Sequence, residues 1–208
     1  MLRRPFAICG FDKTESTVDF AFFTKGGGTL ALSKLKVGET VDVLLPLGNG
    51  FPDNYDGEKV MLIGGGIGVF PLLPCIAKTQ AYTFLGFRSA SHAILVDEFR
   101  VGSKELYLAS DDGTIGTKGY ITDLARKEFD AIKPKAIFCC GPHAMFKAVK
   151  RVFEGIDVPI YVSTEERMGC GFGVCMCCSQ PVGTEGKTEN KLRVCLEGPV
   201  FMLEEVIR

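Results

Sequence analysis

Four cysteines in the last quarter of the sequence constrain this chain more than any other feature. Cys170, Cys175, Cys178 and Cys195 stand at the spacing C-x4-C-x2-C-x16-C, which is the ligand spacing of a plant-type [2Fe–2S] cluster. Two irons bridged by sulfide need four thiolates at one point. A tight loop can supply three of them while a later strand supplies the fourth. The spacing therefore predicts that these four cysteines bind a [2Fe–2S] cluster.

The residues around these cysteines favour such a loop. Gly169, Gly171 and Gly173 tolerate positive φ angles and let backbone N–H groups turn toward the sulfurs, which stabilises their negative charge. Two alternatives stay open: a zinc site, although zinc usually takes paired short-spaced motifs, and a set of buried free thiols. Cys177 is predicted not to be a ligand, although it could replace Cys178 locally. The same prediction is made for Cys9, Cys75, Cys139 and Cys140.

The composition indicates a globular chain with thiolate chemistry. The 208 residues are 46% hydrophobic and carry a net charge of −1, and this length suffices for one or two compact domains. No apolar run reaches transmembrane length, and the first residues lack the apolar core of a signal peptide. We therefore expect a cytoplasmic protein with reduced cysteines and no membrane partner. Because Lys and Arg are scattered, we expect no nucleic-acid partner.

Residues 1–54 are predicted to form part of an antiparallel β-barrel. Three stretches between turn signals are rich in β-branched or aromatic residues or alternate in polarity, namely RRPFAI (3–8), VDFAFF (18–23) and ETVDVLLPL (39–47). Three strands cannot close a barrel. The sequence therefore predicts about half of a small barrel in this region.

Residues 55–165 are predicted to form a doubly wound α/β domain. Strand patterns at 59–64, 81–87, 105–110, 135–141 and 159–163 alternate with helical patterns at 70–79, 95–100, 120–129 and 144–155, which indicates a parallel sheet with crossover helices. The remaining residues, 166–208, are predicted to be a small cluster-binding segment that gains much of its stability from ligation. Its polar stretch 182–191 is predicted to be a hairpin with an exposed tip.

Two turns at the carboxyl edge of the predicted sheet carry further signals. Gly64-Gly65-Gly66-Ile67-Gly68 follows the first strand, with Pro71 placed near the start of the next helix, so that exposed N–H groups would receive a pyrophosphate. Any tight connection can use glycine, so a purely structural turn stays open. The second turn, Cys139-Cys140-Gly141-Pro142, ends the fourth strand at the same edge. A third turn, 110–114, is equally compatible with a structural and a functional role.

Taken together, these parts and motifs resemble the ferredoxin-reductase superfamily, and within it the electron-transfer subunits of class 1B dihydroorotate dehydrogenases. The resemblance covers essentially the whole chain. It rests on the cysteine spacing and on RRPFAI, KGGGTLALSKL, PLGNGF, GGGIGVFPL, LGFRS, CGPHAM and CLEGPVF.

The resemblance implies three cofactors and their contacts. It places FAD against an R-P-x-S strand, where Arg4 would neutralise the pyrophosphate and Ala7 replaces the serine, and against a second strand and a glycine-rich turn. It places NAD on the two turns at the sheet edge. The FAD positions are Arg4, Pro5, Phe6, Ala7, Ala21, Phe22, Phe23, Gly28 and Thr29, and the NAD positions are Gly64, Gly65, Gly66, Gly68, Cys140, Gly141 and Pro142. At least one of Phe22 and Phe23 is expected to be core.

The function that the resemblance implies is electron relay. A partner subunit carrying FMN would oxidise dihydroorotate to orotate in pyrimidine biosynthesis, and electrons would pass through the [2Fe–2S] cluster and FAD to NAD⁺. The resemblance also implies a heterotetramer with two copies of each subunit, and no acid–base catalytic residues in this chain. Family members carry several strands before the R-P-x-S element, so the chain is expected to be a fragment or a late start.

Alternatives from the same and from a different class remain. The small subunit of an NADPH-dependent ferredoxin oxidoreductase or of a sulfhydrogenase is one, although such relatives can replace a cluster cysteine with Asp. A non-enzymatic redox sensor or zinc module is the other. Arg88 and Ser89 could hold the 2′-phosphate of NADP, whereas the resemblance implies NAD.

Overall fold

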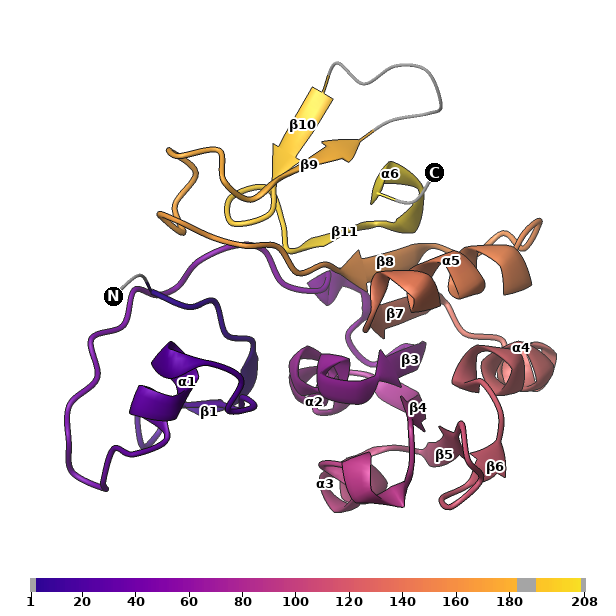
Figure 1. Cartoon of the computed structure of the whole chain (residues 1–208). Coiled ribbons are helices and arrows are strands. Elements are labelled where there is room, and N and C mark those ends of the chain that lie inside the picture. Colours follow the sequence, from indigo (N-terminus) through magenta and orange to yellow (C-terminus); the bar gives the residue numbers. More distant parts are fainter. Residues whose placement is uncertain (1–2, 183–189, 207–208) are drawn as a thin grey trace.

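A seven-stranded sheet in the order β11-β8-β7-β3-β4-β5-β6 organises the chain. The computed structural model describes residues 3–182 and 190–206, and Figure 1 shows a first segment on one side of this sheet and a cysteine-bearing segment above its β8 edge. The five predicted strands are confirmed and run parallel. They are β3 (Lys59–Gly65), β4 (Gln80–Phe87), β5 (Glu105–Ser110), β7 (Ala136–Cys140) and β8 (Ile160–Ser163). A short parallel strand, β6 (Thr117–Lys118), extends the far edge.

Helices cover both faces of this sheet, as predicted for a doubly wound fold. In β3 the residues alternate, with Val60 and Leu62 in one core cluster and Met61 and Ile63 in the other. Both faces of the strand are therefore buried, as expected for a central parallel strand. In Figure 1, one side carries α4 (Ile121–Ile132) and α5 (His143–Val152), and the other carries α3 (Val96–Gly102) and α2 (Leu73–Ile76). The one-turn helix η3 (Ala90–His92) precedes α3.

The segment after the glycine-rich turn differs from its prediction. Gly66–Leu72 is the 3₁₀ helix η2, with Pro71 inside it, and α2 adds only four residues. The predicted α-helix with Pro71 near its start is therefore wrong. Pro71 and Pro74 supply no N–H donors, which prevents regular i to i−4 bonding. Gly66 enters the turn at a φ of +56°.

The first segment contains fewer strands than predicted. β1 (Ile8–Asp12) and β2 (Thr17–Phe20) form an antiparallel pair, followed by the unpredicted helix α1 (Gly27–Leu32). The predicted strand RRPFAI lies almost entirely before β1, and 39–47 is not a strand. Among the described residues no strand pairs with 39–47, and a ladder needs a partner, so its alternating apolar side chains stay exposed. The expected barrel strands therefore reduce to one hairpin here.

The last segment folds back onto the sheet. β9 (Ser179–Val182) pairs with β10 (Asn190–Arg193), and the tip of this predicted hairpin lies outside the described residues. β11 (Val200–Met202) was not predicted. It runs antiparallel to β8 and leads into α6 (Leu203–Val206). The cysteine-bearing segment is thus attached to the sheet by main-chain hydrogen bonds.

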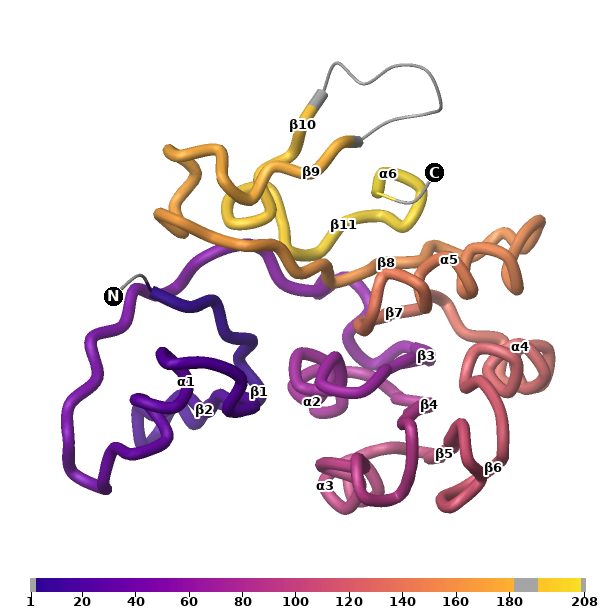
Figure 2. The backbone as a smooth tube through the Cα atoms, viewed as in Figure 1, coloured from indigo at the N-terminus to yellow at the C-terminus, as the bar shows by residue number. Residues whose placement is uncertain are grey.

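The connection from the first segment to β3 passes close to the cysteine-bearing segment. Figure 2 shows this stretch crossing beneath the cysteine loop before it reaches the sheet. Asn49 forms an isolated bridge with Pro199 there, and the one-turn helix η1 (Asp53–Tyr55) follows. None of the helices in the described part of the chain has the length and apolar character needed to cross a bilayer.

Candidate functional site

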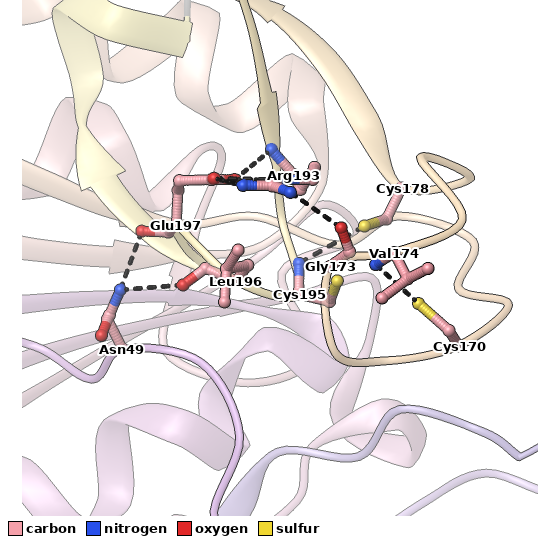
Figure 3. A network of polar contacts seen from close by, with 9 residues as sticks. All are labelled: Asn49, Cys170, Gly173, Val174, Cys178, Arg193, Cys195, Leu196 and Glu197. Carbon is pink, nitrogen blue, oxygen red and sulfur yellow. Dashed lines mark hydrogen bonds and ion pairs between the residues drawn. The ribbon is translucent and has the colours of Figure 1, made fainter.

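The four predicted ligand cysteines lie in two pairs. The backbone N–H of Cys170 donates to Cys175 Sγ at 3.3 Å, and that of Cys195 donates to Cys178 Sγ at 3.4 Å. Figure 3 shows Cys178 and Cys195 side by side, with Cys170 on the neighbouring loop. The late cysteine of the x16 gap has therefore come back to the loop, as the spacing predicts.

The loop around the first pair turns N–H groups toward sulfur. Gly171 and Gly173 have φ angles of +83° and +86°, and the Val174 N–H donates to Cys170 Sγ at 3.3 Å. Backbone N–H groups, first that of Cys175, lower the pKa of the Cys170 thiol to about 6. The predicted positive φ is confirmed for Gly171 and Gly173, whereas Gly169 does not adopt it. The loop favours a thiolate at Cys170, which is the form that ligates metal.

The second pair lies in a small core. The Cys178 and Cys195 residues are 2% and 5% exposed and pack with Val194 and Phe201. Burial raises the pKa of the Cys195 thiol to about 11, and its contact with Cys178 acts in the same direction. Cys175 of the first pair is exposed. The site therefore has a buried side and a side that faces solvent.

Four thiols in two pairs are a donor set that a two-iron cluster takes. Zinc in a structural site takes four ligands around one centre. In a [2Fe–2S] cluster held by four cysteines, the thiolates are shared between two irons, and two pairs of thiols match that requirement. The donor set therefore supports the predicted ligands.

The cysteines that were predicted not to be ligands differ in their surroundings. Cys75, Cys139 and Cys140 are buried in the core of the sheet domain. Burial raises the pKa of Cys75 and of Cys140 to about 12, and raises that of Cys139 well above the usual range. Cys9 lies in β1, and Cys177 is exposed. These three thiols lie in the two core clusters of the sheet domain, apart from the cluster that contains Cys178 and Cys195.

An arginine that sequence reasoning missed holds the cysteine loop and the Cys195 turn together. Arg193 donates through Nη1 to Gly173 O at 2.8 Å and through Nε to Glu197 Oε1 at 3.0 Å. A further bond joins its Nη2 to the same carboxylate, and its backbone N–H donates to Glu197 Oε2 at 2.6 Å. Figure 3 shows this fork between the two backbone segments. In the sequence, only the spacing Arg-x-Cys-x-Glu around the fourth cysteine could have indicated this role of Arg193.

The two glycine-containing turns at the sheet edge lie against each other. A Cβ on Gly68 would stand 2.4 Å from Cys140 O, and one on Gly65 would stand 3.2 Å from Pro142 Cδ. These glycines therefore permit a close backbone approach between the ends of β3 and β7. Gly64 faces Val69 and Leu85 and serves packing. The structure thus brings together the predicted NAD positions Gly64, Gly65, Gly66, Gly68, Cys140, Gly141 and Pro142.

The predicted flavin positions are spread over the first segment. Phe6 stacks on Phe20 with ring centroids 5.5 Å apart and meets Phe22 at 5.3 Å. Phe22 is half-buried and Phe23 exposed, so neither is core and that expectation is wrong. Thr29 Oγ1 accepts the N–H groups of Lys25 and Gly26 at 2.8 and 3.1 Å and so stabilises the start of α1.

The remaining flavin positions differ in exposure. Arg4 and Pro5 are exposed, whereas Ala7 and Ala21 are half-buried and pack toward the sheet core. Gly28 lies in α1. Hence Arg4 and Pro5 are accessible, and the two alanines are partly engaged in packing.

Arg88 and Ser89 lie where a nucleotide ribose would be expected, just after β4. Arg88 is exposed, and Ser89 Oγ is 2.7 Å from His92 Nδ1. The N–H groups of Asp111 and Asp112 donate to Phe87 O and Arg88 O at 3.2 and 3.4 Å. Two carboxylate residues therefore follow the neighbouring strand beside Arg88.

Comparison with known families gives a match in the cysteine-bearing segment. Residues 165–207 match the family described as the iron-sulfur cluster binding domain of dihydroorotate dehydrogenase B. Two curated relatives, from Listeria monocytogenes serotype 4a (strain HCC23) and Geobacillus sp. (strain WCH70), are 40% and 39% identical to this chain. The alignments cover 99% and 100% of this chain and 81% and 80% of the relatives. Both are electron transfer subunits of dihydroorotate dehydrogenase B (NAD(+)).

Solved structures show the same fold. A chain in the structure of an NADH-dependent reduced ferredoxin-NADP oxidoreductase is 31% identical, with a TM-score of 0.83 over 99% of this chain and 74% of that one. A flavohemoglobin from Malassezia yamatoensis with bound FAD and heme has a TM-score of 0.55 at 17% identity, over 76% of this chain and 45% of that one. The second similarity concerns the fold alone.

Proposed function

This chain belongs to the family of electron transfer subunits of dihydroorotate dehydrogenase B, and we propose that it passes electrons from an FMN-carrying catalytic partner to NAD⁺. One observation carries the proposal. Two pairs of thiols, Cys170 with Cys175 and Cys178 with Cys195, lie on the same chain as two glycine turns that meet at the carboxyl edge of a parallel sheet. Such an edge is where open α/β sheets bind nucleotides.

In the proposed relay the cofactors carry the electrons, and the residues of the chain bind and orient the cofactors. When bound, the cluster carries single electrons, and FAD links them to the two-electron chemistry of NAD. The cysteine pairs would hold the cluster, and N–H groups around Cys170 stabilise negative charge at sulfur. The turns at Gly68 and Gly141 would offer backbone N–H groups to the nucleotide, and their glycines let the two turns pack closely against each other. Arg4 and the aromatic residues Phe6 and Phe22 would bind FAD.

We place the partner at the solvent side of the cysteine loop. Phe172, Val174, Met176 and Leu196 are large apolar residues on or beside this loop, and each is at least 45% exposed. Apolar residues gathered on a surface mark an interaction site. A catalytic subunit seated there would cover the exposed Cys175 side of the cluster, and two copies of each subunit would form the heterotetramer.

The proposal includes three functional regions and a compartment. Residues 1–54 would bind FAD, 55–165 would bind NAD, and 166–208 would bind the cluster. All nine cysteines are free thiols, in keeping with the reducing cytoplasm. NAD rather than NADP is proposed, because the two curated relatives are electron transfer subunits of a dihydroorotate dehydrogenase B that is named for NAD(+).

The decisive experiment pairs the chain with its catalytic partner. The purified chain alone should not reduce NAD⁺ with dihydroorotate, since it offers no second flavin beside a proton-accepting group. The two subunits together should do so, and a Cys178→Ser chain should not support the reaction. Dihydroorotate-dependent NAD⁺ reduction by the chain alone would refute the relay role.

One alternative has specific support. The chain is 31% identical to a subunit of an NADH-dependent reduced ferredoxin-NADP oxidoreductase over nearly its whole length. A ferredoxin oxidoreductase subunit would receive electrons from reduced ferredoxin in place of a dihydroorotate-oxidising partner. Adding reduced ferredoxin and NAD⁺ to the chain alone separates the two functions, because only the alternative expects rapid NADH formation.

A further inference from the structure

The loop that leads out of the first segment is bonded to the turn that carries the fourth cluster cysteine. The backbone N–H of Asn49 donates to Gly198 O at 2.6 Å. Its side-chain amide donates through Nδ2 to Glu197 O at 3.0 Å and to Leu196 O at 3.3 Å. Figure 3 shows the amide directed at this turn. All three acceptors lie within three residues after Cys195.

The backbones approach closely beside these bonds. Gly48 has a φ of +70°, and a Cβ there would stand 2.7 Å from Gly198 O and 2.8 Å from Pro199 Cδ. Only glycine fits both the angle and the space. Water competes for a single exposed hydrogen bond, whereas three bonds beside a close backbone contact define one arrangement of the two segments.

The same turn is bonded onward to both cysteine pairs. Cys195 donates its N–H to Cys178 Sγ at 3.4 Å, within the buried pair. Arg193 donates to Gly173 O at 2.8 Å, within the loop between Cys170 and Cys175. A continuous set of contacts therefore joins Asn49 to the whole ligand set.

We propose that Asn49 is a positioning residue whose amide fixes the Cys195 turn, and with it the cluster ligands, relative to the segment that binds FAD. This inference rests on the proposed function. A donor is required because both side-chain bonds end on carbonyl oxygens, and the amide Nδ2 of Asn49 supplies it. The flavin-to-cluster geometry is thus set where Gly48 and Asn49 meet residues 196–199.

The substitution Asn49→Asp tests the amide itself. It keeps the shape of the side chain but replaces the donor with a carboxylate that repels the carbonyls. Asn54→Asp is the matched control, because it adds the same charge at an exposed position of η1 on the same connection. Gly48→Ala tests the same junction by a steric route, without added charge.

Two measurements on the protein reconstituted with iron, sulfide and FAD give the answer. Hydrogen exchange of the segment 193–199 should accelerate in Asn49→Asp and Gly48→Ala and match the parent in Asn54→Asp. Reduction of the cluster by NADH should slow on the order of tenfold in Asn49→Asp, as expected when reacting groups are slightly misplaced. Iron loss in Asn49→Asp but not in Asn54→Asp would also support a role in holding the ligand turn.

Other outcomes of these measurements would contradict the proposed role of Asn49. Exchange and cluster reduction that are the same in Asn49→Asp and Asn54→Asp would overturn the proposal. If Asn49→Asp fails to fold, Asn49→Ala removes the donor without adding charge. Hydrogen exchange of residues 193–199 at the parental rate in Asn49→Ala would then overturn the proposal. Failure of the parent protein to pass electrons from NADH to its cluster would count against the proposed function. The exchange result is independent of that reaction.

Discussion

At the scale of single residues, Arg193 is a side chain outside the ligand set that links the cysteine loop to the Cys195 turn. It bonds Glu197 and the carbonyl of Gly173, and both its side chain and that of Glu197 are about a third exposed. Arg193→Gln should lower the free energy of unfolding by more than the loss of an exposed ion pair does, because several hydrogen bonds to charged groups are lost in a partly solvated place. Denaturant titration, with iron content measured alongside, checks this.

The control for this prediction is another arginine pair. Arg126 and Asp130 form an ion pair four residues apart on α4, with more exposed side chains, so Arg126→Gln should cost at most about 0.5 kcal/mol. Arg193→Lys keeps the charge but loses the planar fork, and it should fall between the parent and Arg193→Gln. Equal losses for Arg193→Gln and Arg126→Gln would show that the fork contributes nothing specific.

Adjacent cysteines give the second prediction at this scale. Cys178 is buried beside Cys195, whereas Cys177 is exposed. Cys178→Ser should abolish the visible absorption of the cluster and reduce bound iron, and Cys177→Ser should leave both at the parental level. A cluster that survives in Cys178→Ser and disappears in Cys177→Ser would shift the ligand assignment by one residue.

At the scale of elements, the conformation of the cysteine loop depends on Gly173, which packs against Leu196 of the Cys195 turn. Gly173 has a φ of +86°, and a Cβ there would lie 2.7 Å from Leu196 Cδ2. Gly173→Ala should therefore cost about 1–2 kcal/mol in backbone strain, and the contact with Leu196 adds to it. Reduced thermal stability with faster iron release to a chelator is the expected result.

Gly155 provides the comparison for that loop. Its φ is +75°, but nothing lies within 4 Å of an added Cβ. Gly155→Ala should show the strain alone and leave iron release unchanged. If the two alanine variants released iron at the same rate, the contact between Gly173 and Leu196 would have no part in holding the cluster.

The elements also show what sequence patterns can and cannot predict. The five predicted strands, β3, β4, β5, β7 and β8, were predictable because each contains an apolar run, and the central strands β3 and β7 are buried on both faces. The polar and exposed two-residue strand β6 gave no such signal. The segment after Gly66 was not predictable, because an apolar run with two prolines favours a helix by pattern while lacking the donors an α-helix needs. The alternation at 39–47 predicts a strand only if a partner is present to pair with it.

In the candidate site, too, some residues could be predicted from the sequence and others could not. Cysteine spacing predicted which thiols meet, because the covalent chain limits how four ligands can converge. Asn49 was unpredictable by this route, since its contacts lie about 147 residues away in sequence and an Asn after Gly48 is an ordinary turn signal. Long-range polar contacts on exposed loops leave no periodic trace.

At the scale of the whole molecule, the sheet and the cysteine-bearing segment should differ in their dependence on metal. The sheet has two large core clusters, whereas the cluster of the cysteine-bearing segment contains four buried residues among those that the structure describes, two of them predicted ligands. Removal of iron by a chelator should therefore raise hydrogen exchange in β9 and β10 and leave β3, β4 and β7 protected. Simultaneous loss of protection in both regions would mean that they unfold as one unit.

Pairing between β11 and β8 has a consequence for the growing polypeptide. β8 ends at Ser163 and its edge partner β11 begins at Val200, with the cysteine loop between them. At 5–20 residues per second, a ribosome needs roughly 2–7 s to make the intervening chain. During that time the nascent sheet has an open edge, to which another nascent chain could add a strand. Translation speed across the cysteine loop therefore sets how long each new molecule is exposed to mispairing.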